Sequence, residues 1–388
     1  MNFKRKFSVA AETLAAICIV AIMVAACGGG SPSGPTSAYL AADGLGEVLQ
    51  FNVNTTSMTY SYAVIDSPMS GVNARQTGTG TLSASGVNPV GAYAVLPSSD
   101  GYIAGGKVFP ISNGVMVGNV ALNSTTPVDI PVFSIPNPVT TLLGVSNVYN
   151  YQGFSCNTTG IANVSGASGC TSQYGTMSIS AFSSTGSSTG SSTGAVYTDC
   201  KGGNYANQTG YPCSSPILSG TIQPSSVAPG VYQLNDSGNN QIGWFFAFTA
   251  PNGQIVGVID HNDTTEYGFT VLTSYAPVLI GNYNGSYMVE TNENQEQWVT
   301  LSTISTTNAS AITVTSTLYT STAQSGVQGT LTPNWPWNGL SAYYIPASAV
   351  AGFPTAISGV AMVTGTGAYT HTSANDPALF AVGVNYGP

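Results

Sequence analysis

Charged residues are scarce in this sequence of 388 amino acids, at 5% of the total, against about 25% in an ordinary soluble domain. Six residues are Lys or Arg and 15 are Asp or Glu, which gives a formal net charge of −9. Six cationic side chains cannot neutralise a phosphate backbone, so a nucleic-acid partner is excluded. The scarcity also excludes a coiled coil. With 43% hydrophobic and 10% aromatic residues, the chain nevertheless has the apolar surface that a packed core needs.

Helical periodicity is also missing. After residue 27, no segment keeps apolar residues at i, i+3, i+4 and i+7 for three turns. Short runs rich in Val, Ile, Thr, Tyr and Phe recur instead, and turn residues separate them. We therefore predict an all-β fold in which antiparallel meanders form a barrel or a sandwich, with a smaller N-terminal β unit. A membrane-spanning barrel is less favoured, because the strands lack a clean ten-residue alternation.

Individual strands are predicted from the same runs. The clearest hairpin joins Trp244–Thr249 to Ile255–Ile259 through Asn252-Gly253, a pair typical of type I′ turns. Prolines near Val128–Ile135 predict an edge strand or an extended linker there. Ile357–Tyr369 is predicted as one strand, and Leu379–Tyr386 as the strand that closes the sheet.

The first 26 residues form a predicted signal peptide. A basic segment at 4–6 precedes an apolar run at 14–24, which is too short to span a bilayer as a helix. The sequence Val24-Ala25-Ala26-Cys27 then resembles the lipobox of bacterial lipoproteins. This resemblance implies cleavage before Cys27 and acylation of that residue with lipid chains such as palmitate. Gly28 in the next position implies the outer membrane. The alternative is an ordinary secretory signal that is cut near Ala26.

Composition divides the remainder of the chain. Residues 27–37 are rich in Gly, Ser and Pro and are predicted to be a flexible tether. Residues 38–137 form the N-terminal β unit, and the boundary lies at a Pro-rich segment near 140. Residues 140–388 are predicted to be one C-terminal barrel or sandwich domain with a low-complexity Ser/Thr/Gly loop at 183–194.

Four cysteines remain once Cys18 leaves with the signal and Cys27 carries lipid. An even number in an exported protein predicts two disulfides. We favour short local loops over the two other pairings, which gives Cys156–Cys170 and Cys200–Cys213. A metal site is the alternative, but the CxxC or Cys/His spacing that it needs is missing.

A wider resemblance rests on three features: the lipobox, the stretch VYNYQGFSC that ends at Cys156, and the paired cysteines after it. Together they resemble uncharacterised lipoproteins of β-proteobacteria that carry a domain of unknown function. These families have no assigned activity, so the resemblance implies no catalytic residue.

Two segments are candidate binding sites. The densest acidic segment could supply oxygen ligands for Ca²⁺, the one cofactor that the sequence indicates, through Asp260, Asn262, Asp263 and Glu266. A polar hairpin turn is the simpler interpretation of that segment. Trp335 and Trp337 flank a proline and are predicted to lie on a loop. Their rings could stack on a sugar or fill a protein pocket, or instead cap the end of a barrel.

The sequence favours a lipid-anchored envelope lipoprotein of the outer membrane, facing the periplasm or the cell surface. Its enrichment in Tyr, Asn, Ser, Thr and Gly is typical of adaptable binding surfaces, so we expect non-catalytic adhesion or ligand binding. The expected partners are the membrane, through the acyl chains, and a glycan or protein ligand. One alternative is a structural envelope component. Another is a glycan hydrolase that uses Asp260, Asp263 or Glu266, although no nucleophile motif or catalytic residue is identified.

Overall fold

A computed structural model describes residues 36–387 apart from fourteen short segments. These segments are 69–74, 85–90, 111–113, 123–127, 158–168, 184–191, 206–210, 214–217, 264–265, 279–284, 292–295, 303–311, 319–326 and 348–354. The predicted signal peptide, Cys27 and nearly all of the tether therefore lie outside the described residues, as does most of the Ser/Thr/Gly loop.

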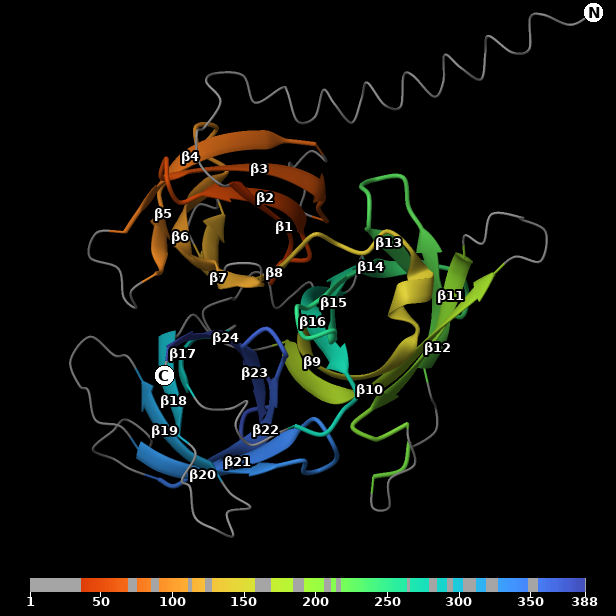
Figure 1. The fold of residues 1–388 in the computed structure, drawn as a ribbon, viewed down its shortest axis with the longest axis vertical. Helices are drawn as coiled ribbons and strands as arrows, with labels where there is room; N and C mark the ends of the chain where they lie inside the picture. Colours follow the sequence, from red (N-terminus) through yellow and green to blue (C-terminus); the bar gives the residue numbers. More distant parts are fainter. Residues whose placement is uncertain are drawn as a thin grey trace, which may run out of the picture.

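The chain folds into three closed barrels, each made of eight antiparallel strands (Figure 1). In each barrel every strand pairs with its neighbours in sequence, and the first strand pairs with the last. A short 3-10 helix, η1 (Leu142–Val145), follows barrel 1. No helix in the described part of the chain has the length and apolar character needed to cross a membrane.

Barrel 1 consists of β1 (Thr36–Asp43), β2 (Val48–Asn54), β3 (Thr59–Asp66), β4 (Thr77–Ser83), β5 (Tyr93–Val95), β6 (Ile103–Pro110), β7 (Met116–Leu122) and β8 (Val128–Pro136). Barrel 2 consists of β9 (Asn147–Asn157), β10 (Cys170–Ser183), β11 (Ser192–Lys201), β12 (Leu218–Pro224), β13 (Tyr232–Asp236), β14 (Gln241–Thr249), β15 (Ile255–Asn262) and β16 (Glu266–Ser274). Barrel 3 consists of β17 (Gly285–Thr291), β18 (Glu296–Ser302), β19 (Ile312–Leu318), β20 (Val327–Pro333), β21 (Ser341–Ile345), β22 (Ile357–Val363), β23 (Ala368–Ser373) and β24 (Phe380–Gly387).

The all-β class is confirmed, and the architecture corrects the expected division of the chain. Residues 140–388 contain two barrels rather than one domain, and the N-terminal unit has as many strands as each of them. Inward-facing and outward-facing residues alternate along every strand of a meander, whichever strand closes the barrel. The periodicity of the strands therefore does not show where one barrel ends and the next begins. The expected hairpin of β14 and β15 is present, and β24 closes barrel 3 against β17.

Two strand predictions were wrong. The proline-flanked segment Val128–Ile135 is not an edge, because β8 pairs with both β7 and β1 and closes barrel 1. Pro131 is accommodated because it lies past the last residue pair of β8 with β1. Ile357–Tyr369 is not one strand but most of a hairpin, β22 and β23, whose turn includes Gly367 at a φ of 77°.

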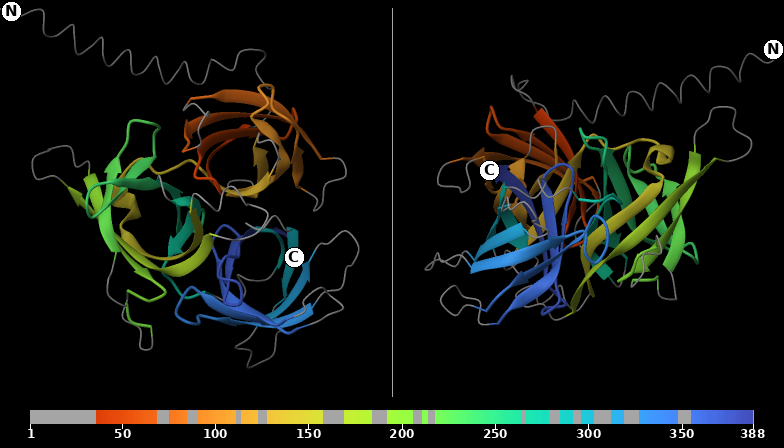
Figure 2. Two further views of the ribbon diagram at one scale, coloured as in Figure 1. Left: turned by 180° about the vertical axis from the view of Figure 1, so that it is seen from behind. Right: turned by 60° about the horizontal axis from the view of Figure 1, so that its bottom comes forward.

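The three barrels surround a common centre (Figures 1 and 2). There β1 contacts β15 and β16, β8 contacts β14, β9 and β10 contact β23, and β7 contacts β24. Strand alternation explains the packing. On β14, Phe245 and Ala247 point into barrel 2, while Phe246 and Phe248 point outward into a core that all three barrels share. These central strands are therefore buried on both faces.

Aromatic rings mark the middle of this shared core. Phe154 of β9 and Phe269 of β16 have ring centroids 5.3 Å apart, and both lie within 5.5 Å of Phe380 of β24. Barrel 1 contributes Phe133 and Ile135 of β8 to the same cluster. Each barrel thus covers the apolar outer wall of the others.

Two buried amides on β9 join barrel 2 to barrel 3. Gln152 Nε2 donates to the Val360 carbonyl at 2.8 Å, and Gln152 Oε1 accepts from Thr370 Oγ1 at 2.6 Å. Asn150 Nδ2 donates to the Asn338 carbonyl at 2.9 Å. These bonds fix the orientation of barrel 3 relative to barrel 2, since apolar packing alone has little directionality.

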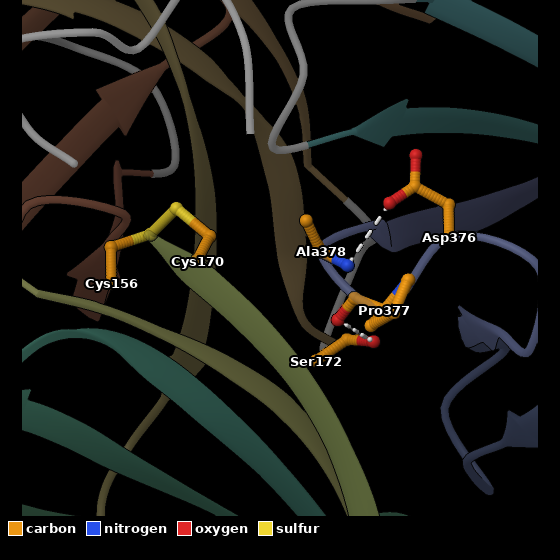
Figure 3. The surroundings of a disulfide bond; sticks show 6 residues. All are labelled: Cys156, Cys170, Ser172, Asp376, Pro377 and Ala378. Carbon is orange, nitrogen blue, oxygen red and sulfur yellow. Dashed lines mark hydrogen bonds between the residues drawn. A yellow bond between two sulfur atoms is a disulfide. The ribbon is translucent and has the colours of Figure 1, made fainter. Parts of the chain in front are cut away.

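A disulfide lies at the end of the same interface. Cys156 and Cys170 are direct cross-strand partners on β9 and β10, and they are bonded to each other. Figure 3 shows the turn of barrel 3 that begins at Asp376 beside them. There the Ser172 hydroxyl of β10 donates to the Pro377 carbonyl at 2.9 Å.

Replacing Gln152 by Leu tests the amide contact. The Val360 carbonyl and the Thr370 hydroxyl would lose their partner in a buried place, at about 1–3 kcal/mol for each unpaired group. We expect a loss of about 2–4 kcal/mol in the free energy of unfolding, measured by urea titration. Gln241→Leu at the exposed start of β14 is the control, with an expected change below about 0.5 kcal/mol. Equal effects of the two variants would contradict the assignment.

Candidate functional site

Trp335 is the exposed member of the predicted tryptophan pair. It lies on the turn between β20 and β21, and 50% of its surface is accessible to solvent. Its ring packs edge-to-face against Tyr211, with a centroid distance of 5.7 Å. We call Trp335 and Tyr211 the aromatic platform.

Hydrogen bonds hold the turn that carries Trp335. Asn334 Oδ1 accepts from the Val278 and Gly339 amides at 2.8 and 3.1 Å, and Asn334 Nδ2 donates to the Val278 carbonyl at 3.1 Å. The Trp335 amide donates to the Leu340 carbonyl at 3.2 Å. The indole is thus presented from a fixed backbone.

Trp337 has a different role from the predicted one. Only 1% of its surface is exposed, and its Nε1 donates to Asn150 Oδ1 at 2.7 Å. Its ring contacts Tyr174 and Tyr211 of barrel 2. Trp337 therefore fastens barrel 3 to barrel 2, and it cannot stack on an external ligand.

Tyr211, the other half of the platform, comes from barrel 2. Its carbonyl accepts from the buried Asn204 amide at 2.8 Å. The second disulfide, Cys200–Cys213, closes the segment that contains both residues. Both favoured pairings are thus present in the structure. The sequence did not single out Tyr211, because its place beside Trp335 depends on how two barrels meet.

The acidic segment does not gather its four predicted ligands into one group. Asp260 faces barrel 1 from β15 and is completely buried. Asp263 Oδ1 accepts from the Glu266 amide at 2.7 Å and thereby stabilises its own turn, and Glu266 is exposed. Among the residues that the structure describes, no group of three or more His, Cys, Asp or Glu side chains is placed to hold a metal ion.

Asn262, the fourth of these residues, bonds to a carboxylate of barrel 1. Asp66 Oδ2 accepts from Asn262 Nδ2 at 2.9 Å and from Trp244 Nε1 at 2.6 Å. A β-bulge opposite Val48 turns Asp66 to the outer side of its barrel. The bulge adds one residue to β3 and so re-aims the side chain towards barrel 2.

Asp43 and Glu47 lie at the β1–β2 turn, next to this contact. Asp43 Oδ1 accepts from the Leu45 and Glu47 amides at 2.9 and 3.1 Å, while its Oδ2 is buried and has no partner. Gly46, at a φ of 80°, lets the turn approach barrel 2, because an added Cβ would lie 2.6 Å from the His261 carbonyl oxygen.

We call Asp43, Glu47, Asp66 and Asp260 the junction carboxyls. Burial raises the pKa of Asp260 well above its usual range, and the charges of Asp66 and Glu47 raise it further. Burial, and then the charge of Glu47, likewise raise the pKa of Asp43 well above its usual range. The pKa of Glu47 is raised by burial, although hydroxyl donors oppose the shift. No pattern in the sequence indicates that these four residues meet.

Both histidines of the chain point into barrel interiors. His261 Nε2 lies 2.8 Å from Thr270 Oγ1 in barrel 2, and His371 packs against Tyr343 and Tyr369 in barrel 3. Burial lowers the pKa of each imidazole to about 4. Both side chains are therefore neutral at pH 7.

No family model and no curated protein matches the chain. Among solved structures, a vaccine-antigen variant of transferrin binding protein B from Haemophilus parasuis aligns with 91% of this chain and 76% of its own length. The sequence identity is 8% and the TM-score is 0.19. A score this low does not establish a shared fold.

The Trp244–Asp66 bond can be tested by a double-mutant cycle. We expect Trp244→Phe to destabilise the protein, because the half-buried carboxylate of Asp66 loses one of its two donors. In an Asp66→Ala background the hydrogen bond is already absent, so Trp244→Phe should cost less stability there. The coupling free energy between the two mutations should be about 1.5–3 kcal/mol, the usual range for a hydrogen bond to a charged group. Urea unfolding of the four proteins gives the coupling, and additive effects would contradict the bond.

Proposed function

We propose that this protein is an extracytoplasmic lipoprotein that binds a glycan on the aromatic platform of Trp335 and Tyr211. The observation that carries the proposal is the half-exposed indole on a fixed turn. Large aromatic side chains are normally used for the area that they bury. In this turn Trp337 already provides that burial, so the exposure of Trp335 calls for another explanation.

The composition of the chain and the flat indole favour a neutral ligand. The face of an indole offers a flat apolar surface, which suits the C–H face of a sugar ring. The chain holds few charges and many hydroxyl and amide side chains, and such groups can bond to sugar hydroxyls without an ionic partner. A glycan therefore fits better than a strongly charged ligand.

The two disulfides indicate an extracytoplasmic protein, because thiols stay reduced in the cytosol. In the proposal, acyl chains on Cys27 then attach it to the outer membrane, as the lipobox pattern implies. One lipidated residue with two or more acyl chains gives stable anchoring.

Binding is tested with an array of bacterial and host oligosaccharides, followed by titration of the best ligand. Trp335→Ala should weaken binding about tenfold or more, since a central tryptophan often contributes more than 1.4 kcal/mol. Tyr344→Ala is the matched control, because this tyrosine of β21 is 51% exposed and lies outside the platform. An array without a ligand, or equal affinities for wild type and Trp335→Ala, would sink the proposal.

Anchoring is tested separately in cells grown with an alkyne analogue of palmitate. The wild-type protein should carry the label and sediment with outer membranes, while Cys27→Ala should carry none and be released in soluble form. Equal labelling of both proteins, or none in either, would contradict lipidation at Cys27. Protease treatment of intact cells then distinguishes a surface-facing from a periplasm-facing protein.

A further inference from the structure

Asp260 is the least satisfied polar group at the contact of barrels 1 and 2. Its side chain has no exposed surface, and neither carboxyl oxygen has a hydrogen-bond partner. It nevertheless faces a neighbouring barrel that carries three more carboxyls. A buried carboxylate with neither donor nor cation is too costly to stay ionised.

We infer that protons bound by the buried carboxyls of this junction hold barrels 1 and 2 together, and that their loss at alkaline pH loosens this contact. The inference concerns Asp43, Glu47 and Asp260, and it does not depend on the proposed glycan binding. It makes the contact between the two barrels a pH-sensitive latch.

Hydrogen bonding decides which carboxyls carry the protons. Glu47 receives the hydroxyls of Ser67 and Tyr102. These two donors stabilise the ionised form of Glu47. Asp260 has no donor, and Asp43 has donors on one oxygen only, so the protons reside first on these two groups.

Among the residues that the structure describes, the groups that face the latch include no cation that could neutralise these carboxyls. Barrel 1 presents Asp43, Glu47, Asp66, Ser67 and Tyr102, and barrel 2 presents Trp244, Asp260, Asn262, Tyr267 and the His261 carbonyl. None of these is a lysine or an arginine. Each carboxyl that ionises therefore adds repulsion to a buried site, and the contact must open or admit water to relieve it.

The contact between barrels 2 and 3 provides an internal control. Its described polar groups include the amides of Asn150 and Gln152, the hydroxyls of Thr370 and Ser172, and the indole of Trp337, none of which titrates between pH 5 and 9. A pH effect on the latch should therefore leave this second contact unchanged.

The sign of the effect follows from linkage. A carboxyl whose pKa is raised on folding binds more protons in the folded state. Its contribution to stability is complete at or below the unfolded pKa near 4, and it is lost as the pH rises through the folded pKa. His261 and His371 act in the opposite direction, but only below about pH 6.5, because their pKa values fall to about 4 on folding. The window from pH 7 to pH 9 isolates the carboxyls.

The test compares the full-length protein with Asp260→Asn by urea unfolding at pH 7, 8 and 9. For each carboxyl that keeps its proton, the folding constant of the wild type should fall about tenfold per pH unit. For Asp260→Asn, the slope of the logarithm of the folding constant against pH should be smaller by about one, because asparagine has no proton to lose. Asp236→Asn, the same change at a half-exposed aspartate that lies outside the junction, should retain the wild-type slope.

Hydrogen exchange, corrected for the intrinsic effect of pH, locates the change. From pH 7 to 9, amides of the β1–β2 turn should lose protection in the wild type, while amides of β9 beside barrel 3 should not. If Asp260→Asn does not fold, Asp43→Asn serves as the test variant, since its side-chain oxygen can still accept from the Leu45 and Glu47 amides.

Two results would overturn the inference. One is an identical pH dependence in the wild type and in the junction variant that folds. The other is stabilisation of the wild type, but not of that variant, by millimolar calcium chloride at pH 8, since a metal ion rather than protons would then neutralise the site.

Discussion

Burial of the outer barrel walls against one another is the interaction on which the rest of this molecule depends. A closed eight-stranded barrel fills its interior with its own side chains, and here three such interiors are separate clusters. The shared core adds a further apolar cluster at the centre, stabilised by about 25 cal/mol for each Å² removed from water. The turn of Trp335, the indole of Trp337 and the carboxyl of Asp260 take their positions from this packing.

Strand identity was largely predictable, while assembly was not. The run Trp244–Phe248 and its Asn-Gly turn predicted a hairpin that is present, and a run without alternation is typical of a strand buried on both faces. The same signals contain no information about which strand closes a ring, so two barrels were expected as one domain. The edge-strand prediction based on Pro131 was wrong for a related reason. A proline fits in β8 because the pairing with β1 ends before Pro131, and the sequence does not show where that pairing ends.

The candidate sites show the same division. Trp335 and Trp337 were correctly identified as unusual, since a proline between them excludes a central strand. Their separate roles depend on Asn150, which is 187 residues from Trp337 in the sequence and bonds to its indole. Of the junction carboxyls, the sequence analysis singled out only Asp260, and it did so as a metal ligand. Asp43 and Glu47 lie in a segment that resembles any glycine-containing turn, and only the docking of barrel 2 buries them.

Ring closure has a consequence for a protein with so few charges. An open sheet presents unpaired amides and carbonyls at its edge strands, and other chains can add to them, which begins aggregation. Charge repulsion normally limits such encounters, but this chain carries charge on only 5% of its residues. In the described structure each of the three sheets closes on itself, so no strand offers its backbone to a neighbour. Many copies of this β-rich, weakly charged protein can therefore lie side by side without pairing through their sheet edges.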